Sequence, residues 1–111
     1  MVCIFCKIAS RDIPIVPLYE DEEFLAFHDV SPQAPVHVLV IPKAHYATLM
    51  DVTDSRLMGR AIEAVKRTAE ALGLTAEGFR IVVNTGENGG QTVPHLHFHL
   101  LGGRFMQWPP G

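Results

Sequence analysis

The sequence predicts an α+β fold: an antiparallel five-stranded sheet with one long and one short helix. Only one long segment, residues 54–72, has apolar residues at helical spacing, and several short apolar segments follow one another through short turns. A parallel sheet would need a helix at each crossover, and the chain has too few. Because the chain has 111 residues, of which 48 % are apolar, we expect residues 1–111 to form a single domain with its own core.

The first part of the chain is expected to form a short helix and three strands. Residues 3–11 fit a helix with Ile4, Phe5 and Ile8 on one side, and prolines at 14 and 17 are expected to end it. Three strands follow, the first two as a tight hairpin and the third after a proline-rich loop: 18–21, 23–28 and 36–41.

The long helix is expected over residues 54–72. Thr53 or Asp54 can cap its first turn, and Gly73 suits the position after its end. Its apolar stripe follows the helical period: Leu57, Met58, Ala61, Ile62, Val65, Ala69 and Leu72. Two further strands are expected on either side of a glycine-rich loop: 79–84 and 95–101.

Composition and charge exclude several classes of protein. The net charge is −3 and the nine Lys and Arg residues are scattered, so there is no basic stripe for nucleic acid. No apolar run reaches the length of a membrane span, and the first residues do not have the pattern of a signal peptide. We therefore expect a cytoplasmic protein that binds neither nucleic acid nor membrane, in which two cysteines need not form a disulfide.

Three histidines occupy alternate positions in the last expected strand. Side chains of a strand alternate between its faces, so His95, His97 and His99 share one face, while the apolar residues between them face the core. Three interpretations are open. The face is simply a polar surface, or it binds a metal with help from Asp29 or His37. Alternatively, one imidazole attacks phosphorus while a second acts as the acid for the leaving group.

The glycine-rich loop 86–92 leads directly into this strand and favours a phosphate over a metal. Glycines allow the backbone to approach an anion closely, and Gln91 and Thr92 could donate hydrogen bonds to phosphate oxygens. Asp29, at the end of an expected strand, could bind the hydroxyls of a ribose. A turn aspartate is the simpler interpretation of Asp29 from the residues alone.

The two ends of the chain carry one further motif each. Cys3 and Cys6 could be a redox pair, half of a zinc site completed by His45 and one of the three histidines, or two free thiols. A redox pair should follow a strand, and only two residues precede Cys3, so that interpretation is disfavoured. Trp108 stands beside two prolines and cannot extend the sheet, so it folds back on its own domain or reaches a partner.

These motifs together resemble the histidine triad (HIT) superfamily. Residues 95–101 (HLHFHLL) match its His-φ-His-φ-His-φ-φ signature, in which φ is an apolar residue. Residues 26–35 with His37, and residues 40–45, look like the central block of the family; Asn84 and residues 89–91 resemble its phosphate loop. The ending, residues 106–111 (MQWPPG), is similar to the Hint branch of the superfamily.

The resemblance implies a homodimeric HIT-like fold and a purine nucleoside phosphoramidate hydrolase that needs no cofactor for catalysis. His97 would attack the α-phosphorus, giving a covalent nucleotidyl-histidine intermediate, and would be assisted by three other histidines: His37, His95 and His99. The product would be a purine nucleotide, AMP or GMP. Asn84, Gln91 and Thr92 would lie at the phosphate and leaving group, and Asp29 at the ribose. The base would be surrounded by Ile4, Phe5, Ile8, Phe27, His28 and Val30, and Trp108 would reach toward the site of the partner subunit.

Two departures from the family pattern bear on the site. Thr92 stands where serine is usual, which keeps the hydroxyl group. Cys3 and Cys6 are absent from many Hint proteins; relatives that carry them resemble zinc proteins. The resemblance then implies a structural, non-catalytic zinc ion held by Cys3, Cys6, His45 and His95.

Three alternatives to a phosphoramidase stay open at this point. The chain could be a dinucleoside polyphosphate hydrolase or nucleotidyl transferase of the same superfamily. It could be a nucleotide-binding or scaffold protein without a catalytic role. It could also be a metal-dependent enzyme.

Overall fold

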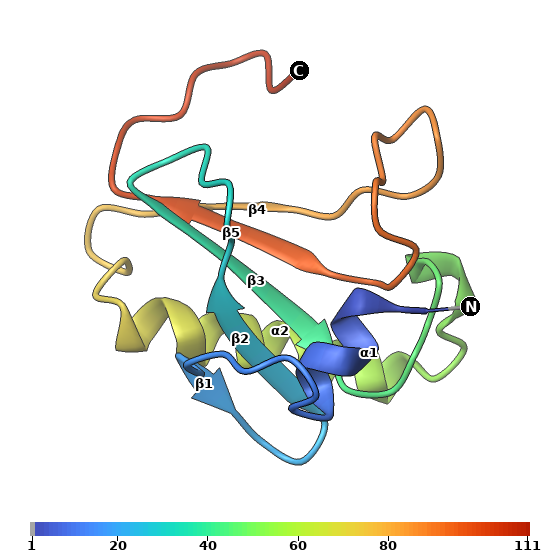
Figure 1. The fold of residues 1–111 in the computed structure, drawn as a ribbon. Coiled ribbons are helices and arrows are strands. Elements are labelled where there is room, and N and C mark those ends of the chain that lie inside the picture. Colours follow the sequence, from blue (N-terminus) through green and yellow to red (C-terminus); the bar gives the residue numbers. More distant parts are fainter. Residues whose placement is uncertain (1) are drawn as a thin grey trace.

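The computed structural model describes residues 2–111 and confirms the predicted α+β class (Figure 1). Five strands form one antiparallel sheet, and there are one long and one short helix. The elements in chain order are α1 (Ile4–Ala9), β1 (Tyr19–Glu20), β2 (Phe24–His28), β3 (Val36–Pro42), a single 3-10 turn (Leu49–Asp51), α2 (Ser55–Ala71), β4 (Arg80–Val82) and β5 (Phe98–Gly102).

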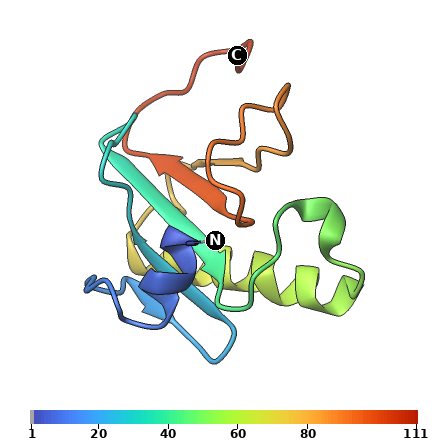
Figure 2. The same cartoon turned by 45° about the vertical axis from the view of Figure 1, so that its right-hand side comes forward.

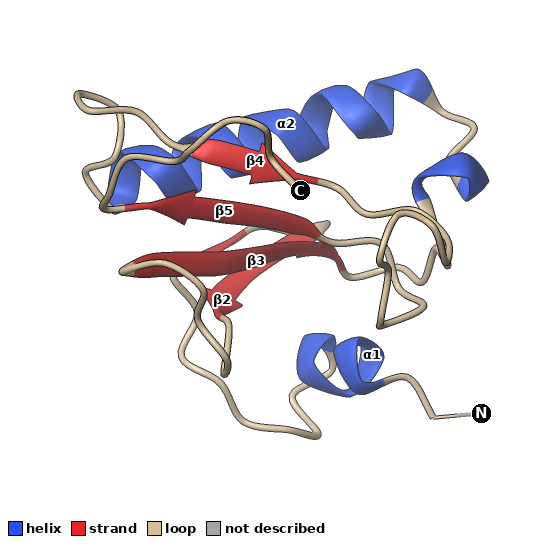
Figure 3. Ribbon diagram, turned by 90° about the horizontal axis from the view of Figure 1, so that it is seen from above, coloured by secondary structure: helices blue, strands red, loops and turns tan. Residues whose placement is uncertain are grey.

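The strand that comes last in the sequence lies inside the sheet. The order is β1-β2-β3-β5-β4, so β5 pairs with β3 on one side and β4 on the other. His99 of β5 lies opposite Leu39 of β3 and Val82 of β4. The two helices lie on opposite faces of the sheet (Figure 3). The sheet therefore has one face under α2 and another under α1.

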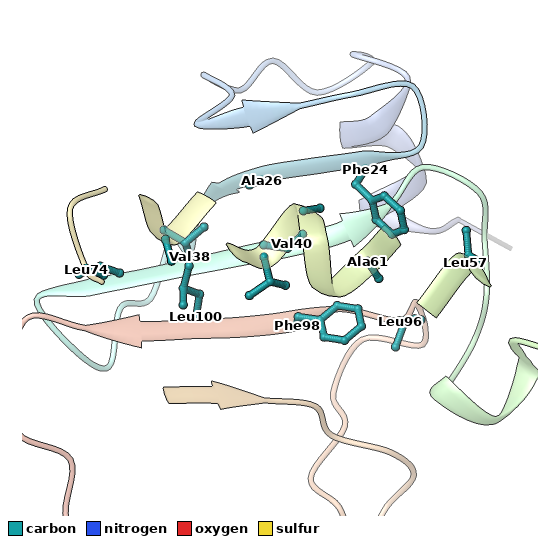
Figure 4. Packing of buried hydrophobic residues seen from close by; sticks show 13 residues of the cluster. Phe24, Ala26, Val38, Val40, Leu57, Ala61, Leu74, Leu96, Phe98 and Leu100 are labelled. Carbon is teal, nitrogen blue, oxygen red and sulfur yellow. The ribbon is translucent and has the colours of Figure 1, made fainter. Parts of the chain in front are cut away.

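The face under α2 carries the larger core. Alternate residues of β3 and β5 point toward the helix, whose Ala61 and Val65 are buried against them (Figure 4). The strand residues of this face are all buried: Val38, Val40, Phe98 and Leu100. As predicted, α2 begins with Asp54, whose side chain accepts a hydrogen bond from Arg56 N. Gly73, with φ of 70°, follows its end.

The face under α1 carries a smaller core. Phe5 and Ile8 of α1 are buried against the side chains of β2 and β3: Leu25, Phe27, Leu39 and Ile41. Ile4, expected on the same side of the helix, is 49 % exposed. A helix of six residues has only enough turns to bury one narrow side. Ile4 lies at its rim.

The prolines at 14 and 17 do not end α1, which stops earlier, at Ala9. The Ile13 N–H bonds to the Lys7 oxygen at 3.1 Å, and Arg11 has a φ of 68°. The backbone reverses at Arg11, in the left-handed region that commonly terminates helices, so the helix ends before either proline.

The histidine segment differs from the prediction in one respect. Regular strand pairing begins at Phe98, and His95 and His97 precede β5. Pro94 has no N–H, the His95 N–H bonds back to the Val93 oxygen at 2.8 Å, and the Leu96 N–H bonds to the loop oxygen of Tyr46 at 2.6 Å. The expected alternation survives, because Leu96 lies in the core under α2 and the His97 ring contacts Phe5 of α1.

The other strands are found where predicted; β3 is one residue longer than expected, and the remaining three are shorter. Strands expected over 18–21, 23–28 and 79–84 are observed as β1, β2 and β4 with fewer residues each. The 3-10 turn was not predicted; Thr48 caps it through reciprocal hydrogen bonds with Asp51. In residues 2–111, no helix combines the length and apolar character needed to cross a membrane.

The core under α2 predicts the cost of a truncation in β5. Leu100 is fully buried, so Leu100→Ala should lower the free energy of unfolding by about 2–5 kcal/mol. Met50→Ala is the control, because Met50 is 77 % exposed and should change stability by less than about 0.5 kcal/mol. Urea unfolding followed by circular dichroism measures both. Equal stability of the two variants would contradict the assignment of β5 to the centre of the core.

Candidate active site

The His97 ring is held by the main chain that leads into β5. Its Nδ1 lies 2.7 Å from the main-chain oxygen of His95. A carbonyl oxygen can only accept a hydrogen bond, so His97 carries its proton on Nδ1 and its lone pair on Nε2. The ring is buried and packs edge-on against Phe5, with ring centroids 5.2 Å apart. The His97 ring is therefore fixed beside α1, with Nδ1 bonded to the main chain.

The His99 ring takes the opposite tautomer through a chain of hydrogen bonds. The Gln33 N–H donates to His37 Nδ1 at 3.0 Å, so the His37 proton is on Nε2. His37 Nε2 lies 2.9 Å from His99 Nδ1 and donates to it. The proton of His99 is thereby placed on Nε2. His97 and His99, whose ring centroids are 4.9 Å apart, thus offer a lone pair and an N–H respectively.

Burial keeps the His99 imidazole neutral. Burial first, and then the nearby His97 and His37 rings, lower the pKa of His99 to about 4, while Asp29 opposes the shift. Burial likewise lowers the pKa of His95 below its ordinary value. Both rings are therefore neutral near pH 7, as the hydrogen-bond pattern requires.

A pocket of about 270 Å³ joins the histidines to the apolar side of α1. Ten residues that the sequence or the family resemblance singled out line it: Ile4, Phe5, Ile8, Phe27, His28, Asp29, Val30, Thr92, His97 and His99. Val30 lines the pocket although its side chain is fully exposed to solvent. Leu39 and Val93 also line it and were missed. The alternation that places Leu39 on the face of His37 was the signal that could have identified Leu39.

Asn84 and Gln91 bond to the main chain in and around the glycine-rich loop. Asn84 Nδ2 donates to the Gly89 oxygen at 2.7 Å. The Gln91 amide donates to the Ala47 oxygen at 2.7 Å and accepts from the Gly86 N–H at 3.0 Å. Neither residue lines the histidine pocket. Their side chains hold the shape of the glycine-rich loop.

The glycine-rich loop is tightly built, and a groove runs beside it. A Cβ at Gly89 would lie 2.3 Å from the Thr85 oxygen, so only glycine fits there. The groove, of about 570 Å³, is lined by residues of this loop and of the segment after β3, including Thr48, Glu87 and Gln91. Thr92 lines both the groove and the histidine pocket, so the two hollows meet at Thr92.

Trp108 lies outside the pocket of its own chain. Its side chain is 80 % exposed, and the Arg80 guanidinium lies 6.0 Å from the centre of its ring. Arg80 also donates to the Gln107 oxygen at 2.9 Å, which ties the tail to β4. The tail thus follows the edge of the sheet.

A second cluster of side chains surrounds Nδ1 of the His95 ring. The N-terminal segment, the segment after β3 and the segment before β5 meet at one end of the sheet (Figures 1 and 2). Cys3, Cys6, His45 and His95 bring their ligand atoms within 4.8 Å of one another there. Cys3 Sγ is 3.2 Å and Cys6 Sγ is 3.6 Å from His95 Nδ1. Cys6 Sγ is 3.4 Å from His45 Nδ1.

This cluster fits the requirements of a tetrahedral zinc site. Zinc bound to two sulfurs and two nitrogens would separate its ligands by about 3.3–3.8 Å. His95 Nε2 donates to the Pro42 oxygen at 2.8 Å, which leaves the Nδ1 lone pair facing the thiols, as a metal ligand requires. Burial and the Cys3 side chain raise the pKa of the Cys6 thiol, so a cation between the sulfurs is what would favour thiolates.

Asp29, His37 and His99 also bring three ligand atoms within 4.8 Å of one another. The other ring nitrogen of His37, however, has a different kind of hydrogen-bond partner from that of His95. Asp29 Oδ2 lies 3.4 Å from His37 Nε2. An imidazole that binds a metal donates its other N–H to an acceptor, whereas His37 Nδ1 accepts from the Gln33 N–H. These three residues suit a hydrogen-bond chain and not a metal.

Solved structures of similar sequence share this fold. A HIT family hydrolase from Legionella pneumophila Philadelphia 1 is 51 % identical, with a TM-score of 0.94 over 99 % of this chain and 100 % of its own. A histidine triad protein from Clostridium difficile is 43 % identical, with a TM-score of 0.90 over 95 % and 93 % of the two chains.

Similarity also extends to more distant and to less studied relatives. A hypothetical histidine triad nucleotide-binding protein from Sulfolobus tokodaii is 33 % identical, with a TM-score of 0.79 over 90 % of this chain and 68 % of its own. An uncharacterized HIT-like protein of Synechococcus elongatus is 56 % identical over 110 residues, 97 % of this chain and 96 % of that protein. The model of the HIT domain matches residues 10–106, and with these relatives it establishes that the chain belongs to the HIT family.

Proposed function

We propose that the protein hydrolyses purine nucleoside 5′-phosphoramidates to a nucleoside monophosphate and an amine. The observation that carries the proposal is the pair of opposite tautomers at His97 and His99, which share one pocket. Such a pair offers a nucleophile and a hydrogen-bond donor to the same reacting centre. The similar Legionella protein is called a hydrolase, and the Sulfolobus protein a nucleotide-binding protein, in agreement with this proposal.

The proposed reaction has two steps. In the first, the His97 Nε2 lone pair forms a bond to the α-phosphorus, and the P–N bond breaks with its electron pair going to the amine nitrogen. The amine nitrogen takes up one proton from solvent water as it leaves, while the His99 Nε2–H donates a hydrogen bond to it. In the second step water attacks the phosphorus, the bond to His97 breaks and one proton is released. The proton taken up in the first step is thus returned.

The pocket residues suggest how the nucleotide lies. We place the base against the apolar side chains of Phe5, Ile8 and Phe27, and the ribose hydroxyls at the Asp29 carboxylate. Asp29 Oδ1 already accepts the Ser31 N–H at 2.8 Å, which fixes the orientation of the carboxylate. The Thr92 hydroxyl and the loop amides would bind the phosphate. Asn84 would act by shaping the loop, and Gln91, which lines the adjoining groove, would face the leaving group.

A dinucleoside polyphosphate is the second candidate substrate. The groove that meets the pocket at Thr92 is larger than the pocket itself, about 570 Å³ against 270 Å³. It could therefore accept a leaving group as large as a second nucleotide. The tail, residues 106–111, resembles the Hint branch and favours the phosphoramidate.

The edge of the sheet supports our proposal that the protein is a homodimer. β4 is an edge strand, and its Ile81 is 39 % exposed. Trp108 is attached to the same edge through Arg80 and is not used by the pocket of its own chain. A second copy across β4 would cover this edge and bring each Trp108 toward the partner subunit.

We also propose that Cys3, Cys6, His45 and His95 hold a structural zinc ion in a protein of the cytoplasm, where thiols remain reduced. The zinc would fix α1, which forms one wall of the pocket, and the His95 ring. It would take no part in either chemical step, because its ligand is the His95 ring, whereas His97 bonds to the main-chain oxygen of His95.

Replacement of the nucleophile should separate binding from catalysis. His97→Ala should bind AMP as the wild type does and lose turnover of an adenosine 5′-phosphoramidate by a factor on the order of 10³ or more. Calorimetry with AMP and a turnover assay measure the two. The same assay with a diadenosine polyphosphate decides between the two candidate substrates. Near-normal turnover by His97→Ala would contradict the mechanism.

The ionisation of His99 should report the bound phosphate. Its pKa is about 4 in the free protein, and we expect AMP to raise it, because the negative phosphate stabilises the protonated ring. An NMR titration of the His99 ring signals, with and without AMP, measures the change. Adenosine, which has no phosphate, is the control and should leave the pKa near 4. A pKa that AMP does not move would place the phosphate elsewhere.

Zinc binding can be tested without any activity assay. Protein prepared with reduced thiols should contain about one zinc ion per chain, and His45→Ala should lower that content and the melting temperature. His28→Ala is the matched control, since His28 lies outside the cluster. Elemental analysis and thermal unfolding measure these effects. Absence of zinc from the wild type, or equal zinc content in both variants, would contradict the proposal.

A further inference from the structure

We propose that Arg104 is a positioning residue for the leaving-group side of the site. It holds the loop between β2 and β3 so that the Gln33 N–H selects the tautomer of His37 and, through His37, that of His99. The effect of Arg104 on catalysis rests on the proposed function, whereas its effect on the tautomers of His37 and His99 does not. Arg104 is outside the pocket and outside every motif that the sequence pointed to.

Arg104 connects the end of β5 to this loop. Its Nη2 donates to the Gln33 main-chain oxygen at 3.1 Å, and its Nη1 donates to the Phe105 oxygen at 3.0 Å. The preceding Gly103 has a φ of 88°, and a Cβ there would lie 2.8 Å from Pro35 Cβ. The loop and the segment after β5 are therefore in close contact, with the guanidinium as the polar link.

The residue that Arg104 holds is the one that faces His37. Arg104 binds the main-chain oxygen of Gln33, and the main-chain N–H of the same residue donates to His37 Nδ1 at 3.0 Å. The neighbouring residues at 32 and 35 are prolines and have no N–H to offer in its place. Orienting Gln33 thus decides whether His37 Nδ1 has a donor.

The Gln33 N–H, together with the Asp29 carboxylate 3.4 Å from His37 Nε2, removes an ambiguity between two imidazoles. His37 and His99 are 2.9 Å apart and, taken alone, can share their hydrogen bond in either direction. If His37 donates, His99 keeps an N–H on Nε2. If His99 donates from Nδ1, its Nε2 carries a lone pair and offers no donor to a leaving group. The Gln33 N–H requires an acceptor at His37 Nδ1, and this selects the first arrangement.

The effect of losing Arg104 should depend on the leaving group. Arg104→Ala should lower kcat about three- to tenfold for an adenosine 5′-phosphoramidate of an alkylamine, which needs a donor as it leaves. For the 4-nitrophenyl ester of AMP, whose leaving group departs without a donor, the loss should be less than about twofold. KM and the affinity for AMP should remain unchanged. Arg104→Lys, which keeps a donor, should restore part of the loss.

Arg56→Ala is the matched control, because Arg56 is an exposed arginine of α2 that pairs with Asp54 and is expected to leave both activities unchanged. Equal losses for both substrates in Arg104→Ala, or a loss of AMP affinity, would show a merely structural role and overturn the proposal. So would unchanged turnover of the alkylamine substrate.

A second measurement reports the tautomers directly. The ¹⁵N chemical shifts of the His37 and His99 rings distinguish a protonated nitrogen from one with a lone pair. In Arg104→Ala we expect signals of a mixture of tautomers, and in the wild type and Arg56→Ala one form with the proton on each Nε2. An unchanged tautomer in Arg104→Ala overturns the inference. If the wild type turns over neither substrate, the proposed function fails, while this measurement still decides the role of Arg104.

Discussion

The hydrogen bond from His97 Nδ1 to the main-chain oxygen of His95 is the interaction on which the site depends. Neutral imidazoles are chemically alike, and only their partners decide which nitrogen keeps a lone pair. A main-chain carbonyl cannot change its role, so the nucleophilic nitrogen of His97 is set by the backbone. Burial lowers the pKa values of the neighbouring His95 and His99 rings and so favours their neutral forms.

Two clusters of similar composition differ for the same reason. His95 gives its Nε2 proton to the Pro42 oxygen and presents a lone pair to two thiols. His37 receives a proton donor at Nδ1 and presents an N–H to His99. The first arrangement suits a metal ion and the second a chain of hydrogen bonds, although the distances within each cluster are comparable. The partner of the second nitrogen, not the number of ligands, separates them.

Local patterns predicted much of this protein. The alternation around Leu96 and Phe98 placed the histidines on the face opposite the core, and Asp54 and Gly73 marked the ends of α2. Contacts between distant segments were beyond such patterns. The bond from Leu96 N to Tyr46 O delays the start of β5, Gln91 turns to the Ala47 oxygen, and Arg104 reaches Gln33. The sequence motifs predicted which residues line the pocket, whereas the positions of the protons on the histidine rings follow only from hydrogen bonds in the folded structure.

The central place of β5 has a consequence for how the chain acquires its structure. β3 and β4 do not pair with each other, and the strand that joins them follows both in the sequence. Its partners in β3 lie far away in the sequence, which makes their pairing a slow, non-local event. A nascent or truncated chain that stops before β5 has an open sheet and no histidine pocket. The protein therefore gains its pocket and its complete sheet together, once β5 has paired with both of its neighbours.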